Sequence, residues 1–111
     1  MRVMIAFGML VASVAIAQAP QPTSSAGLDG KALFKEKCVM CHDKTGMGTG
    51  ILSRRVKVAE LALRNDLNAA FVVTVARAGI GNMPAIPRGE ASDAQLQAIA
   101  EYLAQPPESR K

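Results

Sequence analysis

The sequence is poor in the side chains from which most metal and catalytic sites are built. Its 111 residues include only two cysteines and one histidine, and aromatic residues make up 4%. A structural zinc site needs four ligands, so it is not expected from this set. Dense basic runs interleaved with aromatic residues are also absent, which argues against nucleic-acid binding. The net charge of +4 is mild and would suit weak docking to an acidic patch on a partner protein.

Both cysteines and the histidine lie in one pentapeptide, Cys38-Val39-Met40-Cys41-His42. The pattern C-x-x-C-H is typical of an attachment site for c-type haem. Two thiols three positions apart on a helical turn lie on one side of the backbone, where each can form a thioether to a vinyl group. His42 would then be the first axial ligand of the iron. A thioredoxin-like redox pair would need a βαβ setting, for which no strands are indicated, and a short disulfide would leave His42 unexplained.

A second candidate ligand is Met83, in the segment GIGNMP at residues 79–84. The two glycines and the proline exclude regular structure and place Met83 on a constrained loop. A thioether can complete a six-coordinate haem iron opposite His42 and raise its reduction potential. Of the other methionines, Met40 lies within the tether and Met47 is too near His42 to reach the other face. The alternative is that Met83 only fills the core.

The N-terminal residues 1–17 have the features of a secretory signal peptide. Arg2 precedes an almost wholly apolar stretch, and Ala15-Ile16-Ala17 provides a small-x-small cleavage pattern. Cleavage could instead follow Ala19, or the segment could remain as an uncleaved anchor, although its apolar run is shorter than the ~20 residues of a spanning helix. We therefore predict an exported, periplasmic protein with no membrane span after cleavage.

Apolar side chains recur at helical spacing in four stretches, which predicts helices over residues 30–40, 56–63, 69–78 and 93–104. Asp29, Asn68 and Ser92 are the expected N-caps, and Ser92 with Gln95 forms a capping box. Gly79 is expected to end the third helix, whose valines alone would also suit a strand.

The remaining segments are predicted to be irregular. Residues 18–28 are read as a flexible leader, residues 43–55 as a glycine-containing loop and residues 106–111 as a tail that frays beyond its two prolines. Arg54 and Arg55, at the end of the loop, could pair with haem propionates or simply be solvated.

The order of these features resembles a class I cytochrome c over residues 29–105. Its signs are the first helix, the C-V-M-C-H motif, the late N-M-P loop and a last helix containing I-A-E-Y-L. The resemblance implies an all-α, cytochrome c-like fold of three to five helices wrapped around one covalently bound haem. It also implies that the first and last helices cross, with Gly30 and Phe34 meeting Ile99 and Tyr102. Without it, Gly30 could equally be a residue that merely starts its helix.

The resemblance assigns the haem thioethers to Cys38 and Cys41 and the axial positions to His42 and Met83. Many members of the family carry a proline after the histidine whose carbonyl accepts the second imidazole N–H. Residues 46–52 here contain no proline, so the acceptor for His42 is left open. The segment M-P-A-I-P followed by A-E-Y-L is further similar to small cytochrome subunits of flavoprotein dehydrogenases, such as p-cresol methylhydroxylase.

We therefore predict a periplasmic one-electron carrier with one covalent haem c and no catalytic residues of its own. Its expected partners are redox proteins, with a dehydrogenase as donor and an oxidase or another cytochrome as acceptor. One alternative is a cytochrome subunit of a periplasmic flavin- or quinone-dependent dehydrogenase. Another is a haem enzyme or sensor in which the Met83 position is open.

Overall fold

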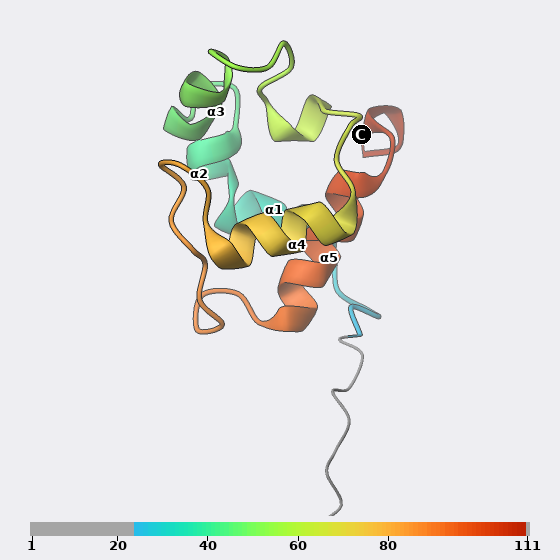
Figure 1. Ribbon diagram of the computed structural model, residues 1–111. Coiled ribbons are helices and arrows are strands. Elements are labelled where there is room, and N and C mark those ends of the chain that lie inside the picture. The colour runs from blue at the N-terminus through green and yellow to red at the C-terminus, as the bar shows by residue number, and fades with distance from the viewer. Residues whose placement is uncertain (1–23, 111) are drawn as a thin grey trace, which may run out of the picture.

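Five α-helices and two turns of 3-10 helix form the regular structure of residues 24–110, the part of the chain that the computed structural model describes (Figure 1). They are α1 (Gly30–Lys37), α2 (Val39–His42), α3 (Met47–Leu52), η1 (Leu61–Leu63), α4 (Ala69–Ala78), α5 (Asp93–Ala104) and η2 (Pro107–Arg110). Between residues 24 and 110 there is no strand, only one isolated bridge between Ile80 and Met83. The predicted all-α class is confirmed. The predicted signal peptide and most of the predicted leader lie outside the described residues.

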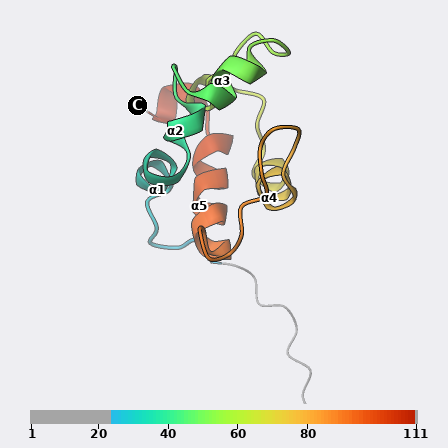
Figure 2. The ribbon, with the colours of Figure 1, turned by 90° about the vertical axis from the view of Figure 1, so that its left-hand side faces the viewer.

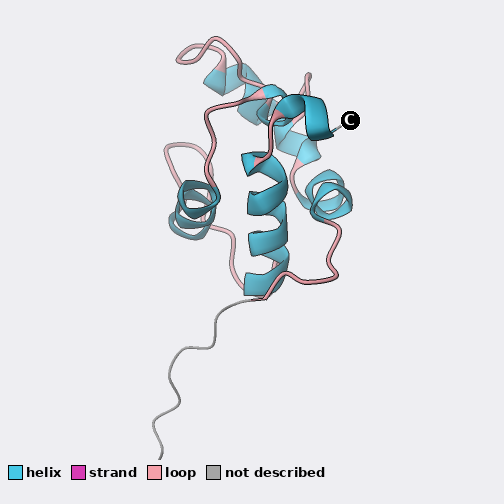
Figure 3. Cartoon of the chain, turned by 90° about the vertical axis from the view of Figure 1, so that its right-hand side faces the viewer, coloured by secondary structure: helices cyan, strands magenta, loops and turns pink. Residues whose placement is uncertain are grey.

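Helix α5 forms the centre of the fold. Helices α1 and α4 lie on opposite sides of it and run crosswise to it, so that α5 is seen lengthwise while its two neighbours are seen nearly end-on (Figures 2 and 3). The side of α5 that faces them is buried, since Leu96, Ile99 and Leu103 are each 2% exposed. The α1, α4 and α5 helices therefore form a frame around one apolar core.

The crossing of α1 and α5 follows the pattern implied by the family resemblance. A Cβ atom at Gly30 would collide with the carbonyl oxygen of Ala98 and would lie 2.9 Å from the Cβ of Tyr102. One turn later, the ring of Phe34 lies 5.7 Å from that of Tyr102 and packs in one cluster with Ile99. Gly30 is thus required for the close approach of the two helices, as well as being the first residue of α1.

The ends of α4 and α5 confirm the predicted caps. Asn68 Oδ1 accepts a hydrogen bond of 2.8 Å from the backbone N–H of Phe71, and Gly79 ends α4 with φ +75°. The Ser92 hydroxyl accepts from the N–H of Gln95 at 3.2 Å, and the Gln95 side chain accepts from the N–H of Ser92 at 3.0 Å. These local signals fix the length of each helix despite the β-branched residues inside α4.

Four predictions about secondary structure were wrong. The first helix is broken at Cys38 into α1 and α2, and the glycine-containing segment predicted as a loop contains α3. The predicted helix over residues 56–63 is reduced to η1, and the predicted frayed tail forms η2. The Gly-rich α3 forms because it packs on α2, and this tertiary contact outweighs its low intrinsic helix propensity.

The turn η2 is held by Arg110, whose residue surface is only 5% exposed. Its guanidinium donates to the carbonyls of Leu61 (3.2 Å), Ala62 (2.9 Å), Arg64 (2.6 Å) and Gln105 (2.7 Å from Nε). Figure 1 shows the corresponding contact between the C-terminal turn and the η1 segment. The turn η2 is therefore fastened to the segment that precedes α4. None of the helices within residues 24–110 is long and apolar enough to cross a membrane.

Candidate haem site

The tether motif lies where α1 ends and α2 begins. The backbone carbonyl of Cys38 accepts hydrogen bonds from the N–H groups of Cys41 (3.2 Å) and His42 (3.0 Å), which forms one helical turn. Both cysteines are free thiols, with Cys38 half-buried and Cys41 exposed. Burial raises the pKa of the Cys38 thiol to about 11. The three side chains line the same cavity, and the predicted one-sided arrangement of the motif is therefore realised.

This cavity has a volume of about 260 Å³ and borders the core formed by α1, α4 and α5. Its wall is mainly apolar and includes Phe34, Leu67, Val72, Leu96, Ile99 and Leu103. Three large apolar side chains of its lining are exposed, namely Met47 (70%), Phe71 (48%) and Ile80 (57%). Such a space suits a flat, apolar group that is held by a few polar or soft ligands.

His42 faces this cavity from α2. Burial lowers the pKa of its imidazole, so the ring is neutral at neutral pH and retains a free nitrogen lone pair. Its Nδ1 is buried and has no hydrogen-bond partner, as is also true of the Oγ1 of Thr49 in the adjacent α3. Neither a proline carbonyl nor any other described protein group accepts a hydrogen bond from this nitrogen. One ring nitrogen of the half-buried His42 is thus unpartnered, and the neutral imidazole keeps a lone pair that a metal ion can accept.

Two glycines of the segment that was predicted to be a loop allow α3 to lie against the tether. A Cβ at Gly48 would stand 2.7 Å from the carbonyl oxygen of Cys41 and 3.1 Å from Cε1 of His42. A Cβ at Gly46 would likewise collide with the backbone of Cys41. Larger residues at either position would push α3 away from the imidazole, so the glycines serve close packing.

Met83 reaches the cavity from the loop between α4 and α5. It closes a tight turn in which the N–H of Ile80 donates to the carbonyl of Met83 at 3.0 Å and the N–H of Met83 donates to the carbonyl of Ile80 at 2.9 Å. The turn needs Gly81, whose φ is +56°. In Figure 2, α2 and this orange loop stand apart on two sides of the upper end of α5. His42 and Met83 both line the cavity from these separate segments.

The cationic side chain at the cavity wall is that of Arg64, which the sequence had not indicated as a candidate. Arg54 and Arg55 are exposed and do not line the cavity, whereas Arg64 does. Its side chain is 14% exposed and donates from Nε and Nη2 to the two carboxylate oxygens of Asp66 at 2.7 and 2.6 Å. This bidentate pair raises the pKa of Arg64 and lowers that of Asp66. In the sequence, the signal for this ion pair was an acidic residue two positions after the arginine.

An all-α frame with a C-x-x-C-H turn and a loop methionine on one apolar cavity defines the class of small monohaem c-type cytochromes. The comparisons with known proteins agree. Residues 25–103 match the family described as cytochrome c oxidase, cbb3-type, subunit III. The chain is also 34% identical over 106 residues to the cytochrome c subunit of 4-cresol dehydrogenase [hydroxylating] from Pseudomonas putida, covering 95% of this chain and 80% of that protein. No solved structure matches the chain at a significant level.

The chain therefore belongs to the class I c-type cytochrome family. Its cofactor is haem c, bound covalently, and its activity is electron transfer with redox partner proteins. The apolar cavity, the free thiols and the neutral imidazole of His42 fit this group.

Proposed function

We propose that the chain is an exported one-electron carrier of the periplasm, in which Cys38 and Cys41 hold haem c by thioethers while His42 and Met83 ligate its iron. The observation that carries this proposal is that all four side chains line one mainly apolar cavity, although Met83 comes from a different segment than the other three. The signal-like sequence of residues 1–17 supports export.

Each residue has a distinct task in this proposal. The haem supplies a one-electron couple at its iron, and the protein controls orientation and electrostatics. The two thioethers would fasten the cofactor to the turn between α1 and α2, and His42 would offer its neutral imidazole to the iron. The soft sulfur of Met83 favours the reduced iron and raises the reduction potential. With both axial ligands supplied by the chain, no substrate needs to bind, and no acid, base or nucleophile is required.

The attachment is tested by mass spectrometry of the protein exported from cells that mature c-type cytochromes. We expect the mass of one haem to be added to the wild-type chain and the haem to persist after denaturation. Replacing both cysteines, as Cys38→Ser with Cys41→Ser, should abolish this addition. A wild-type product without added mass would refute the proposal.

The distal ligand is tested by optical spectra of Met83→Ala and of the matched control Met47→Ala, since both methionines line the cavity. We expect the wild type to show a sharp α band when reduced and a weak methionine-to-iron band when oxidised. Only Met83→Ala should lose the weak band. Its loss in Met47→Ala instead would assign the ligand to Met47.

A second candidate function is that of a tightly held subunit of a periplasmic flavin- or quinone-dependent dehydrogenase. It is favoured by the 34% identity to a protein whose name describes a cytochrome c subunit of 4-cresol dehydrogenase. A pull-down from native periplasm, with haem staining of the denatured band, distinguishes the two. Co-purification with a larger flavoprotein supports the subunit, and recovery of the cytochrome alone supports the free carrier. Rapid carbon monoxide binding to the reduced protein would instead support a haem enzyme or sensor with an open distal site.

A further inference from the structure

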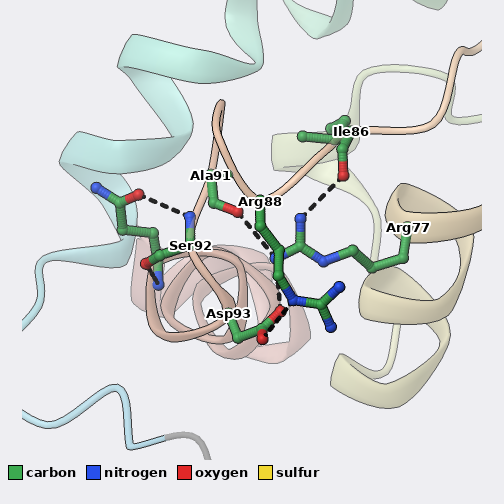
Figure 4. Close-up of polar contacts among 7 residues, drawn as sticks. Arg77, Ile86, Arg88, Ala91, Ser92 and Asp93 are labelled. Atoms are coloured by element: carbon green, nitrogen blue, oxygen red, sulfur yellow. Dashed lines mark hydrogen bonds and ion pairs between the residues drawn. The ribbon is translucent and has the colours of Figure 1, made fainter.

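The loop between α4 and α5, which carries Met83, is fastened by a single side chain of α4. Arg77 donates from Nη1 to the carbonyl of Ile86 at 2.9 Å, and from Nη2 to the carbonyl of Ala91 and to Oδ1 of Asp93, both at 2.8 Å (Figure 4). The Arg77 side chain is 18% exposed. One guanidinium therefore joins the middle of the loop, its end and the first residue of α5 to helix α4.

The contact at Ile86 lies close to the candidate ligand. Only Pro84 and Ala85 separate Met83 from Ile86, and Pro84 has a restricted φ. The N–H of Ile86 donates to the carbonyl of Ala76 at 2.8 Å. Both backbone polar groups of Ile86 are thus bonded to neighbouring residues of α4, namely Ala76 and Arg77. Because three residues of extended chain span at most about 11 Å, the position of Ile86 limits where the Met83 backbone can lie.

We propose that Arg77 is a positioning residue for Met83, because its hydrogen bonds to the Ile86 and Ala91 carbonyls and to Asp93 hold the loop at the distance from α4 that lets the thioether stay on the iron. This inference rests on the proposed function, in which Met83 is the distal ligand. The loop has no regular secondary structure between Met83 and Asp93. Apart from the bond from the Ile86 N–H to the Ala76 carbonyl, its polar contacts with α4 are those of Arg77.

The three hydrogen bonds of residue 77 require an arginine and could not be made by a lysine. Two nitrogens of one planar guanidinium reach three acceptors that lie 9, 14 and 16 residues along the chain. A lysine carries one nitrogen at the end of a flexible stem and cannot reproduce this set. The neighbouring Arg88 contacts the same carboxylate, from Nε to Oδ2 of Asp93 at 2.8 Å, but its side chain is 74% exposed. Figure 4 shows both guanidinium groups meeting at Asp93.

Arg88 therefore supplies a matched control. Arg88→Gln removes the same charge and the same type of carboxylate contact as Arg77→Gln, without removing a bond to a loop carbonyl. The experiment uses oxidised holoprotein and measures the limiting rate at which imidazole displaces the methionine, followed by the loss of the methionine-to-iron band. At saturating imidazole this rate reports how often the thioether leaves the iron.

We expect Arg77→Gln to raise the limiting rate by at least about tenfold, the ratio that loss of even one of its three charge-assisted hydrogen bonds implies. Arg88→Gln should stay within about twofold of the wild type, because an exposed ion pair contributes little. Arg77→Lys should fall nearer to Arg77→Gln than to the wild type. Rates are measured far below the unfolding transition, which guanidinium denaturation of each variant locates, so a general loss of stability does not imitate the effect.

An Arg77→Gln rate equal to that of Arg88→Gln would overturn the inference. So would an Arg77→Lys rate equal to the wild type, because charge alone would then suffice. If Arg77→Gln yields no folded holoprotein, Asp93→Asn decides the matter: it weakens the Arg77 contact, and its rate must exceed that of Arg88→Gln. A wild type that lacks the methionine-to-iron band refutes Met83 ligation itself, whereas a normal band with unchanged rates in the variants refutes only the role of Arg77.

Discussion

Replacement of Gly30 by alanine tests the helix crossing on which the frame depends. The new Cβ would overlap the carbonyl oxygen of Ala98 and stand 2.9 Å from Cβ of Tyr102. The carbonyl belongs to the backbone of α5, where Ala98 is 4% and Ala100 0% exposed, so it cannot turn aside. Helix α1 must therefore move away from α5, which also loosens the contacts of Phe34.

The change in the free energy of unfolding caused by Gly30→Ala follows from two opposing effects. Alanine in place of glycine contributes at most roughly 0.5–1 kcal/mol of stability, the value for a helix interior, because Gly30 is the first residue of α1. Overpacking of a tight contact costs about 1–3 kcal/mol, and the rigid backbone neighbour places Gly30→Ala at the upper end. We expect a net loss of about 2 kcal/mol in the free energy of unfolding, or a fall of roughly 8–16 °C in Tm for a domain of this size.

The assay is guanidinium denaturation of the oxidised holoprotein, followed by circular dichroism. The control is Gly50→Ala in α3, where a Cβ would have nothing within 4 Å and where the residue does not line the cavity. That variant should be unchanged or more stable by up to about 1 kcal/mol. If Gly30→Ala were as stable as the wild type, the close crossing of α1 and α5 would be refuted.

Three further predictions concern capping, the C-terminus and acid. Ser92→Ala should lower the free energy of unfolding by about 1 kcal/mol through loss of the capping box, while Ser24→Ala, which caps no helix, should not. Arg110→Ala should cost about 2–3 kcal/mol in urea denaturation, because it leaves several backbone carbonyls without their donor. The paired arginines lower the carboxyl pKa values of Asp66 and Asp93, so the stability from these pairs is full above the ordinary aspartate pKa and fades as the pH falls below about 4. Denaturation curves between pH 6 and pH 3 should show a smaller fall in a variant with both aspartates changed to asparagine.

Where the signals are local, the fold could be predicted closely from the sequence. Both ends of α4 follow from Asn68 and Gly79, and the start of α5 follows from Ser92 with Gln95. Each of these residues acts on backbone groups within a few positions, so neighbouring residues alone determine the outcome. The family resemblance added the crossing of α1 and α5, which no local pattern contains.

The predictions failed where packing decides the conformation. Gly46 and Gly48 read as loop residues, yet their missing side chains are what lets α3 lie against α2 and His42. The break at Cys38 likewise turns the tether towards the cavity, although the apolar spacing continues through it. Helix propensity and spacing describe a segment in isolation and do not include the neighbour against which it packs.

Two largely buried arginines, Arg77 and Arg110, were not selected from the sequence, since most of their acceptors are backbone carbonyls. Arg77 binds the loop after α4, and Arg110 binds the segment that ends at Arg64 on the cavity wall. A carbonyl acceptor has no signature in the sequence, because every residue carries one. Because every residue carries a carbonyl, an irregular segment can also be held in place through its backbone, whatever its side chains are. Where helices and strands do not satisfy the backbone, a buried guanidinium can satisfy several carbonyls at once, and it ties the segments that carry them to a rigid helix.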